Sequence, residues 1–365
     1  MNFNTKQQVN ISAYQIALVL LICRCQSFMV SIKLRETLNV NNSNIFISMV
    51  ISLLAVFVIY VPAIKLLKKF NYINIIDISK TVFPFAGNVI SIIFALYFIL
   101  MAIAHIANTN FFMLSYVYID ASPFLILGII LVSIYAISVG IESVFRVGAV
   151  IFALFFILNA IVFILLTPAY NFHHLGPFVL SDVTSIIQNS STLTFSAELV
   201  AILIFTEYCK EKTLVTFSWV QIVLFCMEVL LMLCITLVMG RYTNTNTFPL
   251  YTISSMIEVP ILERLESFYI VLDTMLSFVK TSIYIFLSKR CLQHVIGNKF
   301  NISIISVLGV TCLISAVVMT SNIKILKQLV TFLNSPIVIS FLIIVIPILL
   351  LISSKIKKIS HSTAQ

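Results

Sequence analysis

The sequence predicts an all-α polytopic membrane protein, and three observations support this fold class. The composition is 61% hydrophobic and only 10% charged, with a mean hydropathy of +1.12. Apolar runs of about 20 residues, long enough to cross a bilayer as a helix, recur along the chain. Polar residues interrupt some of these runs at membrane depth. We therefore exclude a soluble fold and expect one integral membrane domain over residues 1–365, with no cleaved signal peptide.

The apolar runs predict ten transmembrane helices. Their expected ranges are 11–30, 44–66, 83–107, 122–139, 147–167, 188–209, 214–239, 266–288, 302–320 and 336–354. The ten divide into two sets of five, and the first run of each set carries a polar interruption. This spacing favours an inverted repeat of five plus five helices in which helices 1 and 6 are broken.

The basic residues predict the orientation. With the amino terminus inside, fourteen of the 22 Lys and Arg residues lie in cytoplasmic segments and six in outer loops. Both termini are therefore expected to be cytoplasmic. The basic residues are spread over short loops, so no nucleic-acid partner is expected. The seven cysteines form no CxxC pair, and we expect no disulfide framework, metal site or cofactor.

The segment from Gln188 to Cys209 is the most informative, because it combines bilayer length with polar side chains. In a helix, Ser191, Thr194 and Glu198 share one face, and Ser190 lies beside it. A carboxylate at membrane depth costs a few kcal/mol, on the order of 2.5–3.5, unless it is paired or used. We expect a substrate segment with residues 188–192 unwound; the alternative is a hydrogen-bonded Glu198 that only joins two helices.

Arg24 lies near the middle of the first predicted span and is followed by Gln26 and Ser27. It needs a carboxylate, a group of carbonyls or an anionic ligand, unless it reaches the interface by extending its side chain. One hypothesis is a direct pair with Glu198 that would join the first and sixth spans.

Three further spans carry candidate polar residues. His105 and Asn108 share a face of the third span, where a packing hydrogen bond is the alternative to ligand contact. Glu228 in the seventh span is either a partner for a neighbouring helix or a site residue. In the eighth span, Asp273 and Lys280 are seven residues apart, which is about 10 Å along a helix.

Because of that separation we do not expect Asp273 and Lys280 to pair directly. We expect them to serve in coupling or gating, Lys280 as a fixed cation or a proton-carrying group. The alternative is a buried lysine needed only for assembly. The ninth and tenth spans carry few polar residues and are expected to be scaffold, and the basic tail is expected to contact the lipid bilayer.

Several segments resemble the endospore germination permeases, the B subunits of spore germinant receptors and a branch of the amino acid, polyamine and organocation (APC) superfamily. The resemblance rests on ISAYQ at 11–15, LGP at 175–177, FSAELV at 195–200, FPLYTISSMIEVPILERLESF at 248–268 and FVK at 278–280. The segment at 248–268 is the most specific, and the resemblance covers nearly the whole chain.

This resemblance implies a ten-helix inverted-repeat fold of the LeuT/APC type in the inner membrane of a dormant spore. It implies assembly with an A subunit and a C lipoprotein subunit. It also implies that a small germinant, commonly an amino acid, binds near residues 24–27, 190–198 and Lys280. The first span departs from the family pattern, because CRCQSFMVSIKLRE stands where small residues and a proline are usual. Arg24 at that place is compatible with an anionic germinant, with a changed pocket, or with a family member that no longer binds a germinant.

Two functions remain open from the sequence. The first is a receptor subunit in which germinant binding favours one conformer and so signals to partner subunits. The alternative is a proton-coupled secondary amino acid transporter. An enzyme is not expected, because the chain has no constellation of nucleophile and base and no metal motif.

Overall fold

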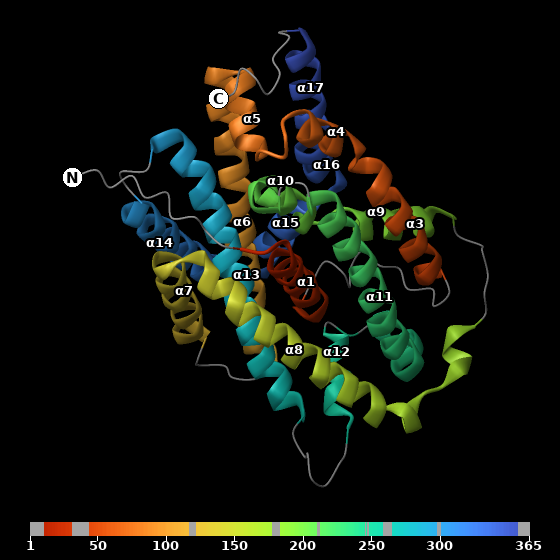
Figure 1. Cartoon of the computed structure of the whole chain (residues 1–365). Helices are drawn as coiled ribbons and strands as arrows, with labels where there is room; N and C mark the ends of the chain where they lie inside the picture. Colours follow the sequence, from red (N-terminus) through yellow and green to blue (C-terminus); the bar gives the residue numbers. More distant parts are fainter. Residues whose placement is uncertain are drawn as a thin grey trace.

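The computed structural model describes residues 11–30, 44–116, 122–176, 183–209, 212–244, 246, 248–257, 265–297 and 301–356. Within these ranges the chain forms helices and no strand (Figure 1). The first half contains α1 (Ala13–Val30), α3 (Asn44–Ile59), α4 (Val61–Lys69), α5 (Ile75–Val82), α6 (Pro84–Tyr116), α7 (Ser122–Val139) and α8 (Ile141–Leu165). The second half contains α9 (Val183–Thr194), α10 (Ala197–Cys209), α11 (Thr213–Met239), α12 (Pro249–Ser255), α13 (Leu265–Ile296), α14 (Asn301–Thr320), α15 (Ile323–Leu333), α16 (Pro336–Ser340) and α17 (Ile346–Ile356).

Eight helical segments are long and apolar enough to cross a membrane. They are 44–69, 84–116, 141–165, 183–209, 213–239, 266–296, 302–320 and 323–356. Two shorter apolar helices, Ala13–Ser27 and Phe124–Val139, occupy the two remaining predicted spans. The all-α polytopic class is therefore confirmed, and the count of ten and the inverted repeat remain predictions.

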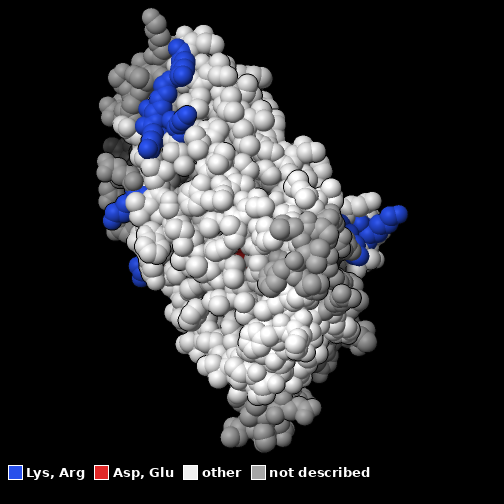
Figure 2. All heavy atoms as spheres, turned by 90° about the vertical axis from the view of Figure 1, so that its right-hand side faces the viewer, with Lys and Arg blue, Asp and Glu red and all other residues white. Residues whose placement is uncertain are grey.

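The surface has the character expected for contact with lipid. Large apolar side chains such as Phe124, Tyr135 and Ile164 are 77%, 70% and 69% exposed. Figure 2 shows one side of the molecule as an almost uncharged surface, with the largest group of Lys and Arg side chains at the upper end and others at its left and right edges. Such a surface suits a hydrocarbon layer bounded by headgroups.

The sixth predicted span is broken, but not where the sequence analysis placed the break. Residues 188–192, expected to be unwound, are helical within α9, and the helix stops at Phe195 and Ser196 before α10 begins. The first helix is not broken within α1, which runs continuously from Ala13 to Val30. It contains neither Gly nor Pro, the residues that interrupt helices most readily.

The last predicted span begins earlier than expected. The segment 323–356 starts with α15, bends at Asn334 and Ser335, and continues through α16, a π-helical turn at Phe341–Val345 and α17. Pro336 explains the bend, because it lacks an N–H and disfavours helical geometry in the residue before it. The end of α15 therefore reaches the interior instead of forming part of an outer loop.

The helices bring α1 and α10 to the middle of the molecule, as Figure 1 shows. α1 packs against α8, α10, α11 and α13, while α6 and α13 pack along each other. The α9 half of the broken helix packs on α3. The helix break is therefore surrounded by the helices that carry the buried polar residues.

Candidate functional site

A small cavity lies at the break between α9 and α10. It measures ≈ 70 Å³ and is lined by residues of α1, α6, α9, α10, α13 and the end of α15. A volume of roughly 10–15 Å³ accommodates one water molecule, so the cavity has room for about five. It therefore suits a ligand with few non-hydrogen atoms.

The cavity brings together seven of the residues predicted from the sequence. They are Arg24, Gln26, Ser27, His105, Asn108, Glu198 and Lys280. Four others do not line it: Ser190, Ser191, Thr194 and Asp273. The helix break explains the three on α9, because it ends the regular spacing that would have placed them on the same face as Glu198. The hydroxyls of Ser190 and Thr194 donate instead to carbonyls of their own helix.

Arg24 is held by the protein on two sides. Its Nε lies 2.7 Å from Oε1 of Glu228, and its Nη2 donates to the Leu193 carbonyl at 3.0 Å. The last carbonyls of α9 lack helical partners because the helix stops, so a cation placed there satisfies one of them and suits the helix dipole. The hypothesis that paired Arg24 with Glu198 is therefore corrected: the ion pair forms with Glu228 on α11.

Glu198 has a different environment. It lies in the first turn of α10, where the positive end of the helix dipole favours a carboxylate. The residue is 2% exposed and lines the cavity. Its carboxylate makes no ion pair or hydrogen bond with any residue that the structure describes. The cavity wall thus presents a carboxylate that has no hydrogen bond or ion pair in the described part of the chain.

Lys280 and Asp273 are connected through Gln26. The Lys280 ammonium donates to Oε1 of Gln26 at 3.3 Å and to the Ser27 hydroxyl. At the other end of the same amide, Nε2 of Gln26 lies 3.3 Å from Oδ1 of Asp273. The expectation that the two charged residues do not pair directly agrees with this geometry, in which an amide of α1 lies between them.

Two buried groups in the cavity wall retain hydrogen-bonding capacity. Nε2 of His105 and the hydroxyl of Tyr284 have no hydrogen-bond partner among the described residues. Buried polar groups without partners are uncommon in folded proteins and call for an explanation. A ligand with a neutral polar group would satisfy them.

Among the cavity residues that the sequence analysis missed are Val330 and Asn334. Both lie at the end of α15, in the stretch between the ninth and tenth predicted spans. The signal that would have found them is the amphipathic pattern of residues 323–333 followed by Asn-Ser-Pro, which marks a helix ending inside the bundle.

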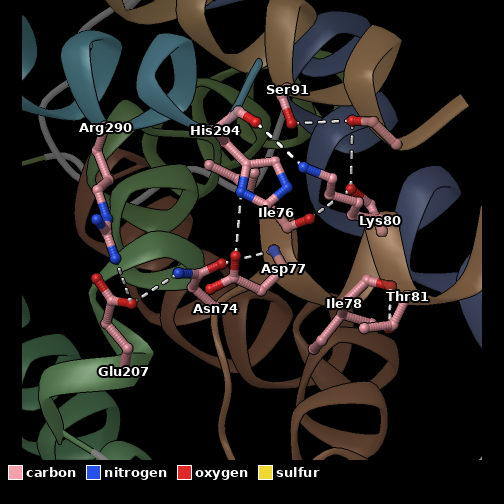
Figure 3. A network of polar contacts seen from close by, with 12 residues as sticks. Asn74, Ile76, Asp77, Ile78, Lys80, Thr81, Ser91, Glu207, Arg290 and His294 are labelled. Atoms are coloured by element: carbon pink, nitrogen blue, oxygen red, sulfur yellow. Dashed lines mark hydrogen bonds and ion pairs between the residues drawn. The ribbon is translucent and has the colours of Figure 1, made fainter. Parts of the chain in front are cut away.

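A second polar cluster lies at the far end of α10 (Figure 3). Oε2 of Glu207 accepts hydrogen bonds from Asn74 at 2.7 Å and from Arg290 at 3.1 Å. Asn74 is also the N-cap of α5, because its Oδ1 accepts from the backbone N–H of Asp77. We call Asn74, Asp77, Lys80, Glu207, Arg290 and His294 together the α5 network.

His294 completes the α5 network. Its Nδ1 lies 3.1 Å from Oδ1 of Asp77, and its carbonyl accepts from Lys80 at 3.4 Å. Burial works to raise the pKa of Asp77, but the hydrogen bond and charge of His294 and the charge of Arg290 outweigh it, so this pKa lies below its usual value. The network thus joins α5, α10 and α13 beside a cleft of ≈ 290 Å³.

Comparison with known proteins gives the family. A search of curated proteins found no match. A family model described as "Spore germination protein" matches residues 10–324, which is most of the chain. The broken helix, the polar cavity beside it and this match agree, and the chain belongs to the spore germination permease family.

Proposed function

We propose that this protein is the membrane-embedded subunit of a spore germinant receptor and that a small germinant, such as an amino acid, binds in the cavity beside the helix break. The observation that carries the proposal is the cavity itself, which both Glu198 and Lys280 line at the point where α9 and α10 separate. Family membership supplies the biological context. Discontinuous helices in membrane proteins commonly form such binding sites.

The same helix offers a route for the signal. Glu198 and Glu207 are nine residues apart on α10, about 13.5 Å along a rigid helix. A ligand that binds Glu198 more tightly in one orientation of α10 favours that orientation. Movement of α10 then changes the contacts of Glu207 with Asn74 and Arg290, and so the positions of α5 and α13.

The α5 network lies at the end of the molecule that we expect to be cytoplasmic. The positive-inside pattern favours this side for α5 and for both termini. We propose that the protein lies in the inner membrane of a spore. Its cytoplasmic end then transmits the movement of α10 to an A subunit and a C lipoprotein subunit. The domain is then a single ten-helix unit with the inverted repeat predicted from the sequence.

A second candidate is a proton-coupled amino acid transporter. The Lys280, Gln26 and Asp273 chain favours it, because ionisable groups connected inside a membrane protein are typical of proton pathways. Uptake of labelled amino acid into liposomes that contain this chain alone would support transport. A response that requires the partner subunits, without uptake, would support the receptor.

The first test is a binding screen of the amino acids on the purified protein, by thermal shift and calorimetry. We expect at least one to stabilise the wild type and to lose its effect in Glu198→Gln. The matched control is Glu142→Gln, which removes a carboxylate that pairs with Arg146 at 3.7 Å outside the cavity. Binding that is equal in both variants would place the site elsewhere.

A further inference from the structure

The charges around the cavity do not balance. The described part of the chain has six buried charged residues: Arg24, Glu198, Glu228, Asp273, Lys280 and Lys289. Lys289 is nine residues beyond Lys280 on α13, about 13 Å away, and does not line the cavity. The remaining five comprise two cations and three carboxylates, so one negative charge is left over when all are ionised. His105 adds a positive charge only when it is protonated.

Both cations are already engaged by the protein. Arg24 contacts Glu228 and the Leu193 carbonyl, and Lys280 donates to Gln26 and Ser27. A buried charge is tolerated at low cost only when it is paired and hydrogen-bonded. An anionic ligand would have to compete with these contacts.

The carboxylate that a ligand can reach is Glu198. Glu228 is occupied by Arg24, while Asp273 lies outside the cavity lining, where Gln26 donates to it. Glu198 lines the cavity without an ion pair or hydrogen bond to any described residue. A positively charged group placed there would be held by a charge-assisted hydrogen bond.

We propose that this cavity selects small ligands of net charge +1, whose ammonium group binds the Glu198 carboxylate, over zwitterionic and anionic ligands of the same size. The inference rests on the proposed function and specifies its ligand class: a primary amine of about five or six non-hydrogen atoms with a neutral polar group, such as an amide. That neutral group meets Nε2 of His105 and the Tyr284 hydroxyl. The assignment differs from one of the three explanations that the sequence analysis gave for Arg24, an anionic germinant.

The test uses ligands that differ in charge at nearly constant shape. Glycinamide, glycine and glycolate carry charges of +1, 0 and −1, and alaninamide, alanine and lactate repeat the series with one more carbon. Dissociation constants are measured by calorimetry on the purified full chain. We expect the amides to bind tightest, the zwitterions about tenfold more weakly, and the hydroxy acids not at all.

The variants assign the preference to one residue. Glu198→Gln should weaken amide binding about tenfold to a hundredfold and abolish the charge preference, as loss of a charge-assisted hydrogen bond implies. Glu198→Asp keeps the charge, so it should keep the order of the series at lower affinity even if Glu198→Gln folds poorly. Glu142→Gln should match the wild type.

Each contrary result has a distinct meaning. Tightest binding of glycolate or lactate, or an unchanged order in Glu198→Gln, overturns the assignment of a cation site. If neutral amino acids bind as tightly as the amides, and both bind the Gln variant more weakly than the wild type, the inference fails while the proposed function stands. If no member of either series and no amino acid of the full screen binds, both fail.

Discussion

The two ends of α10 carry the same side chain in opposite situations. Glu198 faces the cavity and makes no hydrogen bond or ion pair with the described residues, whereas Glu207 accepts from Asn74 and Arg290. One carboxylate has no hydrogen bond or ion pair among the described residues, and the other connects three helices. Under the proposed function, the first carboxylate binds the ligand and the second makes a structural contact.

The comparison extends to Glu228, another buried carboxylate. Glu228 lies 2.7 Å from Arg24 and is 7% exposed, close to the 2% of Glu198. The two carboxylates are therefore similarly buried, and they differ in whether they form an ion pair. We therefore expect very different consequences from breaking the Arg24–Glu228 pair and from neutralising Glu198.

The largest expected effect is on stability, from breaking the Arg24–Glu228 pair. Arg24→Ala leaves the Glu228 carboxylate buried without its partner, which should cost about 3–5 kcal/mol. Glu198→Gln removes no hydrogen bond or ion pair within the described chain, so it should leave the melting temperature nearly unchanged. Thermal unfolding of both variants in the same detergent measures the contrast.

A double variant checks the reason for this effect. Arg24→Met combined with Glu228→Leu removes both charges together, and stability should recover relative to Arg24→Ala. Equal destabilisation by Glu198→Gln and Arg24→Ala would contradict the distinction between a paired and an available carboxylate.

The second prediction tests how tightly the α5 network is held against α6. A Cβ added to Gly87 would lie 2.7 Å from both Cα and N of Lys80, so Gly87→Ala must push α5 away. Overpacking of this kind costs about 1–3 kcal/mol. We expect faster hydrogen–deuterium exchange in α5, with ligand affinity at the cavity retained.

The control for that variant is Gly128→Ala on α7, where an added Cβ meets no atom within 4 Å. It should be neutral or slightly stabilising, because alanine is the better helix former. If both variants leave α5 exchange unchanged, α5 does not depend on its close contact with α6.

The sequence could predict the apolar segments and most of the polar residues that line the cavity, because helical spacing assigns residues to a face of their own helix. It could not predict partners across helices. Arg24 and Glu228 are 204 positions apart, and nothing local to either residue distinguishes Glu228 from Glu198 as the partner. The break after Thr194 was misplaced for a related reason: Ser and Thr are compatible with both a helix and an unwound segment, and the surrounding packing decides between them.

The third prediction concerns signalling and is smaller in energy. Glu207→Gln removes the charge that pairs with Arg290 but keeps an acceptor for Asn74. Because the Arg290 side chain is 37% exposed, solvent screens the pair, and the stability loss should be at most about 1 kcal/mol. Ligand affinity should stay close to wild type, while germination without germinant should increase if the α5 network holds the resting state.

Spores that carry Glu207→Gln, compared with spores that carry Glu142→Gln, give the measurement. Combining Glu207→Gln with Glu198→Gln should abolish the response to germinant but keep the raised basal rate. A basal rate equal to that of the control would mean that the α5 network supports the fold without holding the resting state.

The smallest expected effect is a pH dependence at Asp77. Its pKa in the folded protein lies below the usual value of about 3.9, so its contribution to stability is complete above that value and is lost as the pH falls through the folded pKa. The Asp77 side chain is 40% exposed, which keeps the contribution small. The difference in melting temperature between wild type and Asp77→Asn should therefore be constant at pH 5–6 and shrink below about pH 4. Parallel profiles down to pH 3 would show that the contact with His294 does not stabilise the ionised carboxylate, and that the α5 network depends on Glu207 alone for its charge pairing.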